Sequence, residues 1–248
     1  MDCGGYNKGK VNPGQEPKMS VSLAVAANNP HSAPPTAMAS MPWSSETRDG
    51  PDRNGVVLHF VPERQIYAEG DEARSFYKVV SGVVRTCRFL NDGRRQIDAF
   101  HMAGEVFGFE AGATHEMAAE AVSECTVIAY RQRGLEAMVS GDGRMGRWFF
   151  SHVMTCLTLA REHSLLLSRG SAAQKIAAFL QEIANREGND SRIDLPMSRQ
   201  DIADYLGLTI ETVSRTLSQL DRDGIIALPS ARKVVLNDRR ALRTLSGS

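Results

Sequence analysis

The chain has 248 residues and carries 29 Lys and Arg against 29 Asp and Glu, so its formal net charge is zero. This balance excludes a polycation that binds nucleic acid through bulk charge, and the length allows one or two domains with real cores. Its four cysteines, Cys3, Cys87, Cys125 and Cys156, follow no zinc or disulfide spacing, and no apolar run approaches a membrane span. We therefore expect a cytoplasmic protein with reduced thiols and no membrane partner.

Residues 1–54 are rich in Pro, Ala, Ser, Asn and Gly and show no sustained hydrophobic period. Such a composition cannot bury enough apolar surface to compensate for the entropy of ordering. The sequence predicts a disordered N-terminal extension over this range.

Within a domain predicted over residues 55–140, residues 55 to about 132 read as short strands separated by turn signals such as Glu69–Asp71, Asn91–Gly93 and Ala103–Glu105. Apolar or alternating runs lie between these turns, at 76–80, 83–89 and 94–100. The spacing predicts an antiparallel roll or barrel, followed by a short helix at about 133–140.

Residues 141–169 contain a long helix, predicted from about Asp142 to Ser168. One set of side chains recurs in steps of four and three, which is the spacing of a coiled-coil seam. The predicted dimer-interface residues are Phe149, Val153, Cys156, Ala160, His163 and Leu167. A single buried helix that needs no partner is the simpler alternative; the sustained heptad spacing favours a parallel homodimer.

Residues 170–248 begin with a helix capped by Ser171 and a strand near 192–195. Two short helices follow, and then two apolar strands around Pro229–Arg232, which predict a hairpin or wing. A last helix is expected from Asp238, with Asn237 as its N-cap.

The two short helices have clear boundaries and faces. Ser198 is a good N-cap, Gly207 provides a left-handed stop, and Thr209 caps the second helix. The outward face of the second helix presents Ile210, Glu211, Ser214 and Arg215. An ordinary corner between two helices, with a solvated Glu–Arg pair, would show the same pattern. In a DNA major groove, Arg could bind guanine through two hydrogen bonds and Glu could accept from cytosine.

The run Ile210-Glu211-Thr212-Val213-Ser214-Arg215 resembles the E-x-x-S-R recognition helix of the FNR branch of CRP/FNR transcription regulators, and within it FixK-type proteins. The resemblance covers about residues 55–246. It implies an α+β fold: an antiparallel β-roll sensor domain like that of cyclic-nucleotide-binding proteins, a long dimerisation helix and a C-terminal winged helix-turn-helix.

The same resemblance bears on cofactors. In cyclic-nucleotide members a Gly-Glu pair and an Arg-Ser pair hold ribose and phosphate; here Gly104-Glu105 is present, but His115-Glu116 stands at the second position. A carboxylate there would repel a cyclic phosphate. Oxygen-sensing members need several cysteines for an iron–sulfur cluster, and the position of their ligand in the roll aligns with Ile128. We expect neither cyclic nucleotide nor cluster.

Side chains in the roll also suggest a metal-dependent β-barrel enzyme as a remote alternative. The candidate ligands are His101, Glu105, Glu110, His115 and Glu116. No His-x-His pair is present, and ordinary surface or turn positions explain these residues better. We therefore expect no metal and no catalytic residue.

The favoured hypothesis is a homodimeric transcription regulator that is not an enzyme and binds double-stranded DNA at a palindrome. Ile210, Glu211, Ser214 and Arg215 would read bases. The expected phosphate contacts are Ser198, Arg199, Gln200, Thr209 and Thr212. The resemblance implies a TTGA…TCAA site, activation through RNA polymerase, and genes of low-oxygen respiration or nitrogen fixation. A regulator of the same fold gated by an unknown small molecule or redox signal is the alternative.

Overall fold

A computed structural model of the protein describes Met1 and residues 55–131, 143–168, 170–189 and 191–247. The predicted N-terminal extension and the predicted helix at 133–140 lie outside these ranges. Beyond Met1, the described residues belong to one compact unit, Ala37–Ser248. The finer division at residues 140 and 169 remains a prediction.

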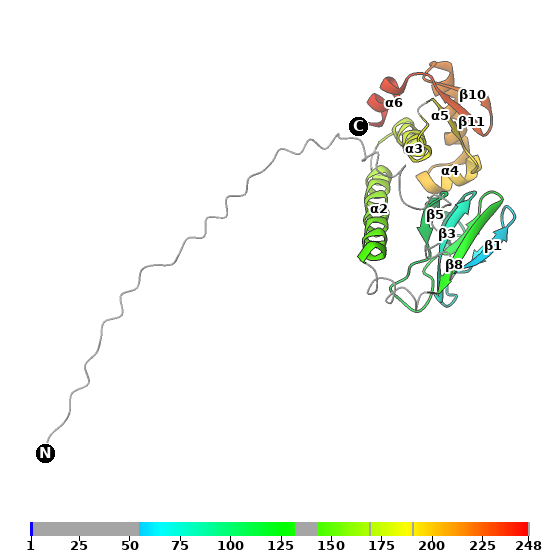
Figure 1. The fold of residues 1–248 in the computed structure, drawn as a ribbon. Helices are drawn as coiled ribbons and strands as arrows, with labels where there is room; N and C mark the ends of the chain where they lie inside the picture. The colour runs from blue at the N-terminus through cyan, green and yellow to red at the C-terminus, as the bar shows by residue number, and fades with distance from the viewer. Residues whose placement is uncertain (2–54, 132–142, 169, 190, 248) are drawn as a thin grey trace. The chain divides into compact units, whose positions relative to one another are not determined.

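Within residues 55–131, eight strands form two antiparallel four-stranded sheets (Figure 1). The first sheet has the order β1-β8-β3-β6 and the second has the order β2-β7-β4-β5. Their bounds are β1 Val56–Phe60, β2 Gln65–Tyr67, β3 Ser75–Ser81, β4 Val84–Phe89, β5 Arg95–His101, β6 Val106–Phe107, β7 Ala118–Ala121 and β8 Cys125–Arg131. The three predicted apolar runs coincide with β3, β4 and β5, which confirms the predicted roll.

Apolar side chains from both sheets fill the interior of the roll. Val79, Val84, Ala119 and Val127 are completely buried there. Alternate residues of a strand point to opposite faces, so each short strand contributes only one or two side chains to this core. A larger core involves the C-terminal helices and also includes Phe100 of β5. The strands and the C-terminal helices are therefore packed together within the unit.

Three helices and a small sheet follow the long helix α2 (Gly143–Ser168) and the helix α3 (Ala172–Glu187). The helices are α4 Arg199–Leu206, α5 Ile210–Arg222 and α6 Arg239–Ser246. The sheet has the order β10-β11-β9, with bounds β9 Arg192–Asp194, β10 Ile226–Ser230 and β11 Lys233–Leu236. The β10–β11 hairpin is the predicted wing, and Figure 1 labels both of its strands beside α5.

The helix ends follow local chemistry. Ser171 caps α3 in a reciprocal capping box with Gln174, and the left-handed Gly188 ends that helix. The N-cap of α6 is Asp238, whose side chain accepts a hydrogen bond from the Ala241 N–H. The prediction that Asn237 would cap this helix is therefore wrong by one residue; the Asp238 carboxylate performs the same role.

Candidate nucleic-acid interface

The helix pair α4–α5 has the predicted helix-turn-helix boundaries. The Ser198 side chain accepts from the Asp201 N–H, and Asp201 Oδ2 accepts from the Ser198 N–H at 2.9 Å, which makes a capping box. Gly207 has φ 62° and its N–H donates to the Ala203 carbonyl. Only a left-handed residue can end the helix this way, which glycine adopts without strain. Thr209 then caps α5.

The outer face of α5 is open. Val213, Leu217 and Leu220 are buried on its inner side. Glu211, Ser214 and Arg215 are exposed, and Ile210 keeps 38% of its surface. These last four residues, which we call the reading face, lie together on one open part of the surface. The structure thus brings together all four residues predicted to read bases.

Glu211 and Arg215 have complementary charges at i and i+4. Hydrogen bonds from its own backbone N–H and from the Thr209 hydroxyl, together with the Arg215 charge, hold the pKa of the Glu211 carboxyl below its usual value. Glu211 is therefore an ionised acceptor at neutral pH. Arg215 supplies a planar fork of donors, so the reading face offers both a donor and an acceptor to base edges.

The residues predicted to contact phosphate lie at the starts of α4 and α5, where backbone N–H groups favour anions. Ser198, Gln200 and Thr209 are exposed, whereas Arg199 and Thr212 are half-buried. Nη1 of Arg199 is buried and has no hydrogen-bond partner within the described part of the chain. Because this atom is out of reach of solvent, a phosphate could meet only the exposed part of the half-buried Arg199 side chain.

Local bonds engage the other predicted phosphate contacts. Gln200 Nε2 donates to Asp204 Oδ1 at 2.6 Å, and the hydroxyls of Thr209 and Thr212 lie 3.1 Å apart. The Ser198 hydroxyl donates to Asp201 Oδ2 at 2.8 Å. These bonds hold the side chains in place at the helix ends. A phosphate contact by Ser198 or Gln200 would therefore use a hydroxyl or amide group that already donates to Asp201 or Asp204.

The long helix α2 presents a different stripe from the predicted seam. Val153, Cys156 and Ala160 are exposed, whereas His163 is buried against the protein's own α4 and Leu167 lies beside Gly207 at the end of α4. His163 is 9% exposed, stacks on Tyr205 with ring centroids 4.0 Å apart, and its Nε2 lies 2.8 Å from the Tyr205 carbonyl oxygen. Phe149 packs edge-on against Phe109 at 4.9 Å. These contacts occupy half of the predicted seam.

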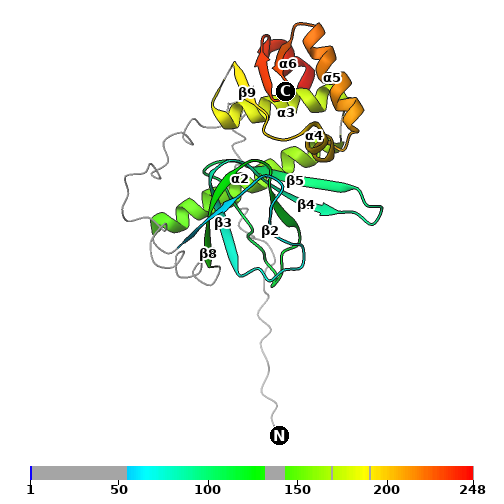
Figure 2. The ribbon, with the colours of Figure 1, turned by 90° about the vertical axis from the view of Figure 1, so that its right-hand side faces the viewer.

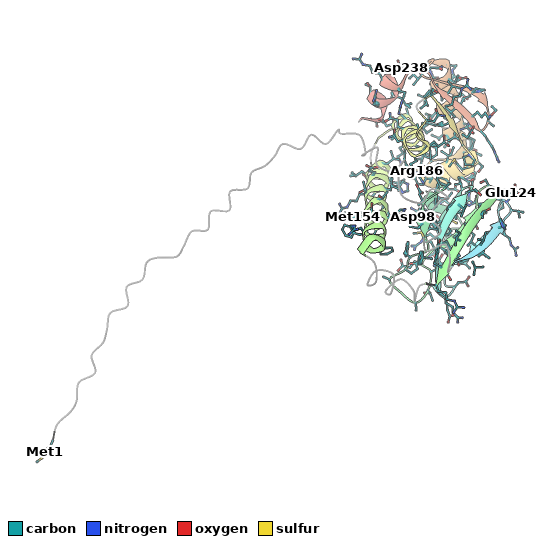
Figure 3. The ribbon with its side chains drawn as sticks, in the orientation of Figure 1. Met1, Asp98, Glu124, Met154, Arg186 and Asp238 are labelled. Atoms are coloured by element: carbon teal, nitrogen blue, oxygen red, sulfur yellow. The ribbon has the colours of Figure 1, made fainter. Side chains whose placement is uncertain are left out.

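The exposed apolar face of α2, which we call the α2 stripe, lies roughly a quarter turn away from that seam. Figure 3 labels Met154 on the side of α2 that points away from the strands. The exposed large apolar residues of this helix are Phe150, Val153, Met154, Leu157 and Leu165. The heptad spacing indicated a seam, but both faces of α2 carry apolar residues, so spacing alone could not choose between them.

Inside the roll, the two positions compared with cyclic-nucleotide contacts have other partners. Glu105 binds Arg186, which is labelled in Figure 3, with Oε2 2.7 Å from Nη2. His115 is 2% exposed and stacks on Tyr67 with ring centroids 3.6 Å apart. Tyr67 in turn stacks with Tyr77 at 5.5 Å. Protein side chains therefore fill the space around these positions.

The remaining candidate metal ligands and thiols also have structural surroundings. Burial, with the Arg186 charge, lowers the pKa of His101 to about 3, and its Nε2 lies 3.1 Å from the Thr86 hydroxyl. Across the described ranges no three His, Cys, Asp or Glu side chains gather as metal ligands would. Burial and the nearby Glu120 raise the pKa of Cys87 to about 11, which suppresses its thiolate.

One functional cluster was absent from the sequence analysis. Arg85 of β4 and Arg95 of β5 bind Asp201 of α4, at 3.0 Å and 2.5 Å. Asp201 lies in the first turn of α4, where a negative charge is favourable in any helix, so its position in the sequence does not point to the cluster. Arg85 lies in a strand that also contains Thr86 and Arg88, and nothing in that strand indicates a partner on α4.

Comparisons with known proteins agree with this geometry. Residues 174–245 match the family model for a Crp-like helix-turn-helix domain, and residues 57–142 match the cyclic nucleotide-binding domain. The described helices include none with the length and apolar character that a membrane crossing requires. A roll of this type joined to such a helix-turn-helix defines a DNA-binding transcription regulator.

The chain belongs to the CRP/FNR family of these regulators. It is 44% identical over 196 residues to the nitrogen fixation regulation protein FixK of Azorhizobium caulinodans, covering 77% of this chain and 79% of that one. It is 43% identical over 190 residues to FixK of Rhizobium meliloti, covering 77% and 87%. The solved structure of FixK2 from Bradyrhizobium japonicum matches with a TM-score of 0.74 and 41% identity, covering 78% and 98%.

Proposed function

We propose that this regulator is a homodimer that binds a TTGA…TCAA palindrome and activates genes of low-oxygen respiration or nitrogen fixation. The observation that carries the proposal is the reading face, with Ile210, Glu211, Ser214 and Arg215 exposed together on the outer side of α5. Two relatives are named as nitrogen fixation regulation proteins, which supports the proposal that the target genes belong to this class. Activation would proceed through contact with RNA polymerase in the cytoplasm.

Base recognition would divide between two charged side chains. Arg215 would donate two hydrogen bonds to guanine O6 and N7, and the ionised Glu211 would accept from cytosine N4. Ser214 would assist between them, and Ile210 would touch a thymine methyl group. Arg199, half-buried at the start of α4, would contact a phosphate and fix register without reading sequence.

Dimerisation would use the α2 stripe. Phe150, Met154 and Leu157 are between 41% and 66% exposed on one side of this helix. Burying them against a second copy would remove their apolar surface from water. A two-fold axis along α2 would present the two reading faces to half-sites about one helical turn apart, which is the reason for a palindromic operator.

DNA binding would require no cyclic nucleotide. The Glu105–Arg186 ion pair and the stacking of His115 on Tyr67 support this proposal, because they engage the positions that would hold ribose and phosphate. The relatives are transcription regulators, so they lend no support to a metal-dependent enzyme.

The test is a mobility-shift titration of the purified protein on a TTGA…TCAA palindrome, in air and without cyclic nucleotide. We expect specific binding that a scrambled palindrome does not compete. A strict requirement for cyclic AMP, or equal affinity for the scrambled site, would contradict the proposal.

A further inference from the structure

Arg85 is a buried arginine at the junction between the roll and α4. Its side chain is 2% exposed and binds three carboxylates from three separate segments. Nε donates to Glu120 at 2.9 Å, Nη2 to Glu63 at 2.5 Å and Nη1 to Asp201 at 3.0 Å. A buried guanidinium must be paired in this way, so its orientation is fixed by all three partners.

Arg95 makes a second link to the same helix. Its Nη2 donates to Asp201 Oδ1 at 2.5 Å, and its Nε donates to Asp204 Oδ2 at 2.8 Å. We call Arg85, Arg95, Asp201 and Asp204 the arginine bridge. Figures 1 and 2 both show α4 next to β5, where the bridge lies.

The bridge acts on the start of the helix-turn-helix itself. One oxygen of Asp201 forms the capping box with Ser198, while the other receives both arginines. The carboxylate that begins α4 is therefore also the group that joins α4 to the roll. Any change in the direction of α4 would have to break these bonds.

Aromatic contacts hold the other end of α4. Tyr205 lies with its ring centroid 5.2 Å from that of Phe100 in β5 and 4.0 Å from that of His163 in α2. Nζ of Lys175 in α3 donates to the Leu206 carbonyl oxygen at 3.1 Å. Helix α4 is thus fixed at both ends, against the roll, α3 and α2. The last of these is the helix that carries the α2 stripe.

This docking leaves the DNA-reading side free. The bridge uses Asp201 and Asp204 of α4, whereas Glu211, Ser214 and Arg215 of α5 remain exposed. The docked arrangement is therefore compatible with entry of α5 into a groove.

We propose that Arg85 and Arg95 are positioning residues for operator recognition. They fix the angle of the helix-turn-helix to the roll, and because Tyr205 holds the same α4 against His163 of α2, they set the half-site spacing that the dimer accepts. This inference rests on the proposed function of a dimer that reads a palindrome. Each recognition helix reads its own half-site alone, but the separation of two half-sites is matched only if both helix pairs keep one angle.

The experiment measures spacing preference in Arg95→Gln, because Arg95 keeps 16% exposure and its replacement leaves Arg85 paired. Competition titrations would compare palindromes with the wild-type spacer and with spacers one or two base pairs longer or shorter. A single half-site serves as a further competitor. We expect the preference for one spacer to fall about tenfold, within the usual range of coupling between sites. Half-site affinity and base preference should not change.

Arg94→Ala is the matched control, since this neighbouring arginine is exposed and bonds to Asp92 within its own hairpin. It should keep the wild-type spacing preference. In a double-mutant cycle, Arg95→Gln and Asp204→Asn should be non-additive in their effect on spacing preference, because both changes break the same ion pair, whereas two unrelated structural effects would add. Thermal melts would show whether each variant is folded, and Asp204→Asn provides the test if Arg95→Gln is not.

An unchanged spacing preference in folded Arg95→Gln would overturn the inference while leaving the proposed function intact. Tighter binding of the optimal palindrome would also overturn it, because the bridge would then hold α4 in an unproductive position. If the wild-type protein prefers no palindrome at all, the proposed function fails first, and the inference fails with it.

Discussion

The two helices of the helix-turn-helix use charged residues in opposite ways. On α5, Glu211 and Arg215 are exposed and interact only weakly with the rest of the fold. On α4, Asp201 is 2% exposed and is bonded to Arg85 and Arg95. Removing an exposed charge changes the free energy of unfolding little, whereas leaving a buried charge without its partner lowers it strongly. Changes on α5 should therefore affect DNA binding, and changes on α4 should first affect folding and geometry.

The largest effect should come from Asp201→Ala. This change leaves the buried Arg85 with one carboxylate fewer and removes the capping box of α4. Breaking a buried ion pair costs about 3–5 kcal/mol, and we expect a loss of that size in the free energy of unfolding measured with urea. Ser198→Ala is the control, because it removes only the cap and should cost about 1 kcal/mol. Equal costs for the two variants would show that the bridge adds nothing to stability.

Leu157→Glu should be next, acting on the dimer. Two copies of the helix would then place like charges opposite each other, which costs about 3 kcal/mol and raises the dimer Kd about 100-fold. Sedimentation equilibrium would measure this. His163→Ala tests the competing seam: because His163 packs on Tyr205, it should lower stability and leave the dimer Kd unchanged. If His163→Ala raises the dimer Kd and Leu157→Glu does not, the predicted heptad seam, and not the α2 stripe, is the dimer interface.

Arg215→Ala should cost about 1–3 kcal/mol of binding free energy per half-site and relax the preference for guanine. The urea midpoint should not move, since the side chain is exposed. Arg199→Ala should weaken all sequences about equally and reduce the salt dependence of binding. Competition titrations at fixed salt separate the two. Our assignment of roles fails if Arg199→Ala is the variant that alters base preference.

Much of the fold was predictable because its signals are local. The caps Ser198 and Thr209 and the stop at Gly207 depend on neighbours within one helical turn. The reading face follows from the same periodicity. The arginine bridge was not predictable, because Arg85 and Asp201 are 116 residues apart and no local sequence pattern around either residue indicates that they are in contact. The packing of His163 on Tyr205 was not predictable for the same reason, and the predicted dimer seam on α2 stays a prediction.

The smallest effect concerns Thr209→Ala, which should cost about 1 kcal/mol as a lost N-cap. It also removes a hydrogen bond to Glu211, so the pKa of that carboxyl should rise toward its usual value. The pKa of Glu211 is lower in the folded protein than in the unfolded chain. The ionised carboxylate therefore stabilises the fold above the unfolded pKa, and this stabilisation is lost as pH falls through the folded pKa. A carboxyl NMR titration should show this loss beginning at higher pH in the variant, while the exposed Ser218→Ala leaves it unchanged.

The long sequence separation within the bridge also has a consequence for folding rates. Contacts between residues far apart in the chain close large loops, and those of Arg85 with Asp201 need both the strands and α4 to be formed beforehand. We therefore expect the bridge to form after the rate-limiting transition state. Its loss would then accelerate unfolding and leave refolding nearly unchanged, so the lifetime of the native protein depends on two arginines that lie outside its DNA-reading helix.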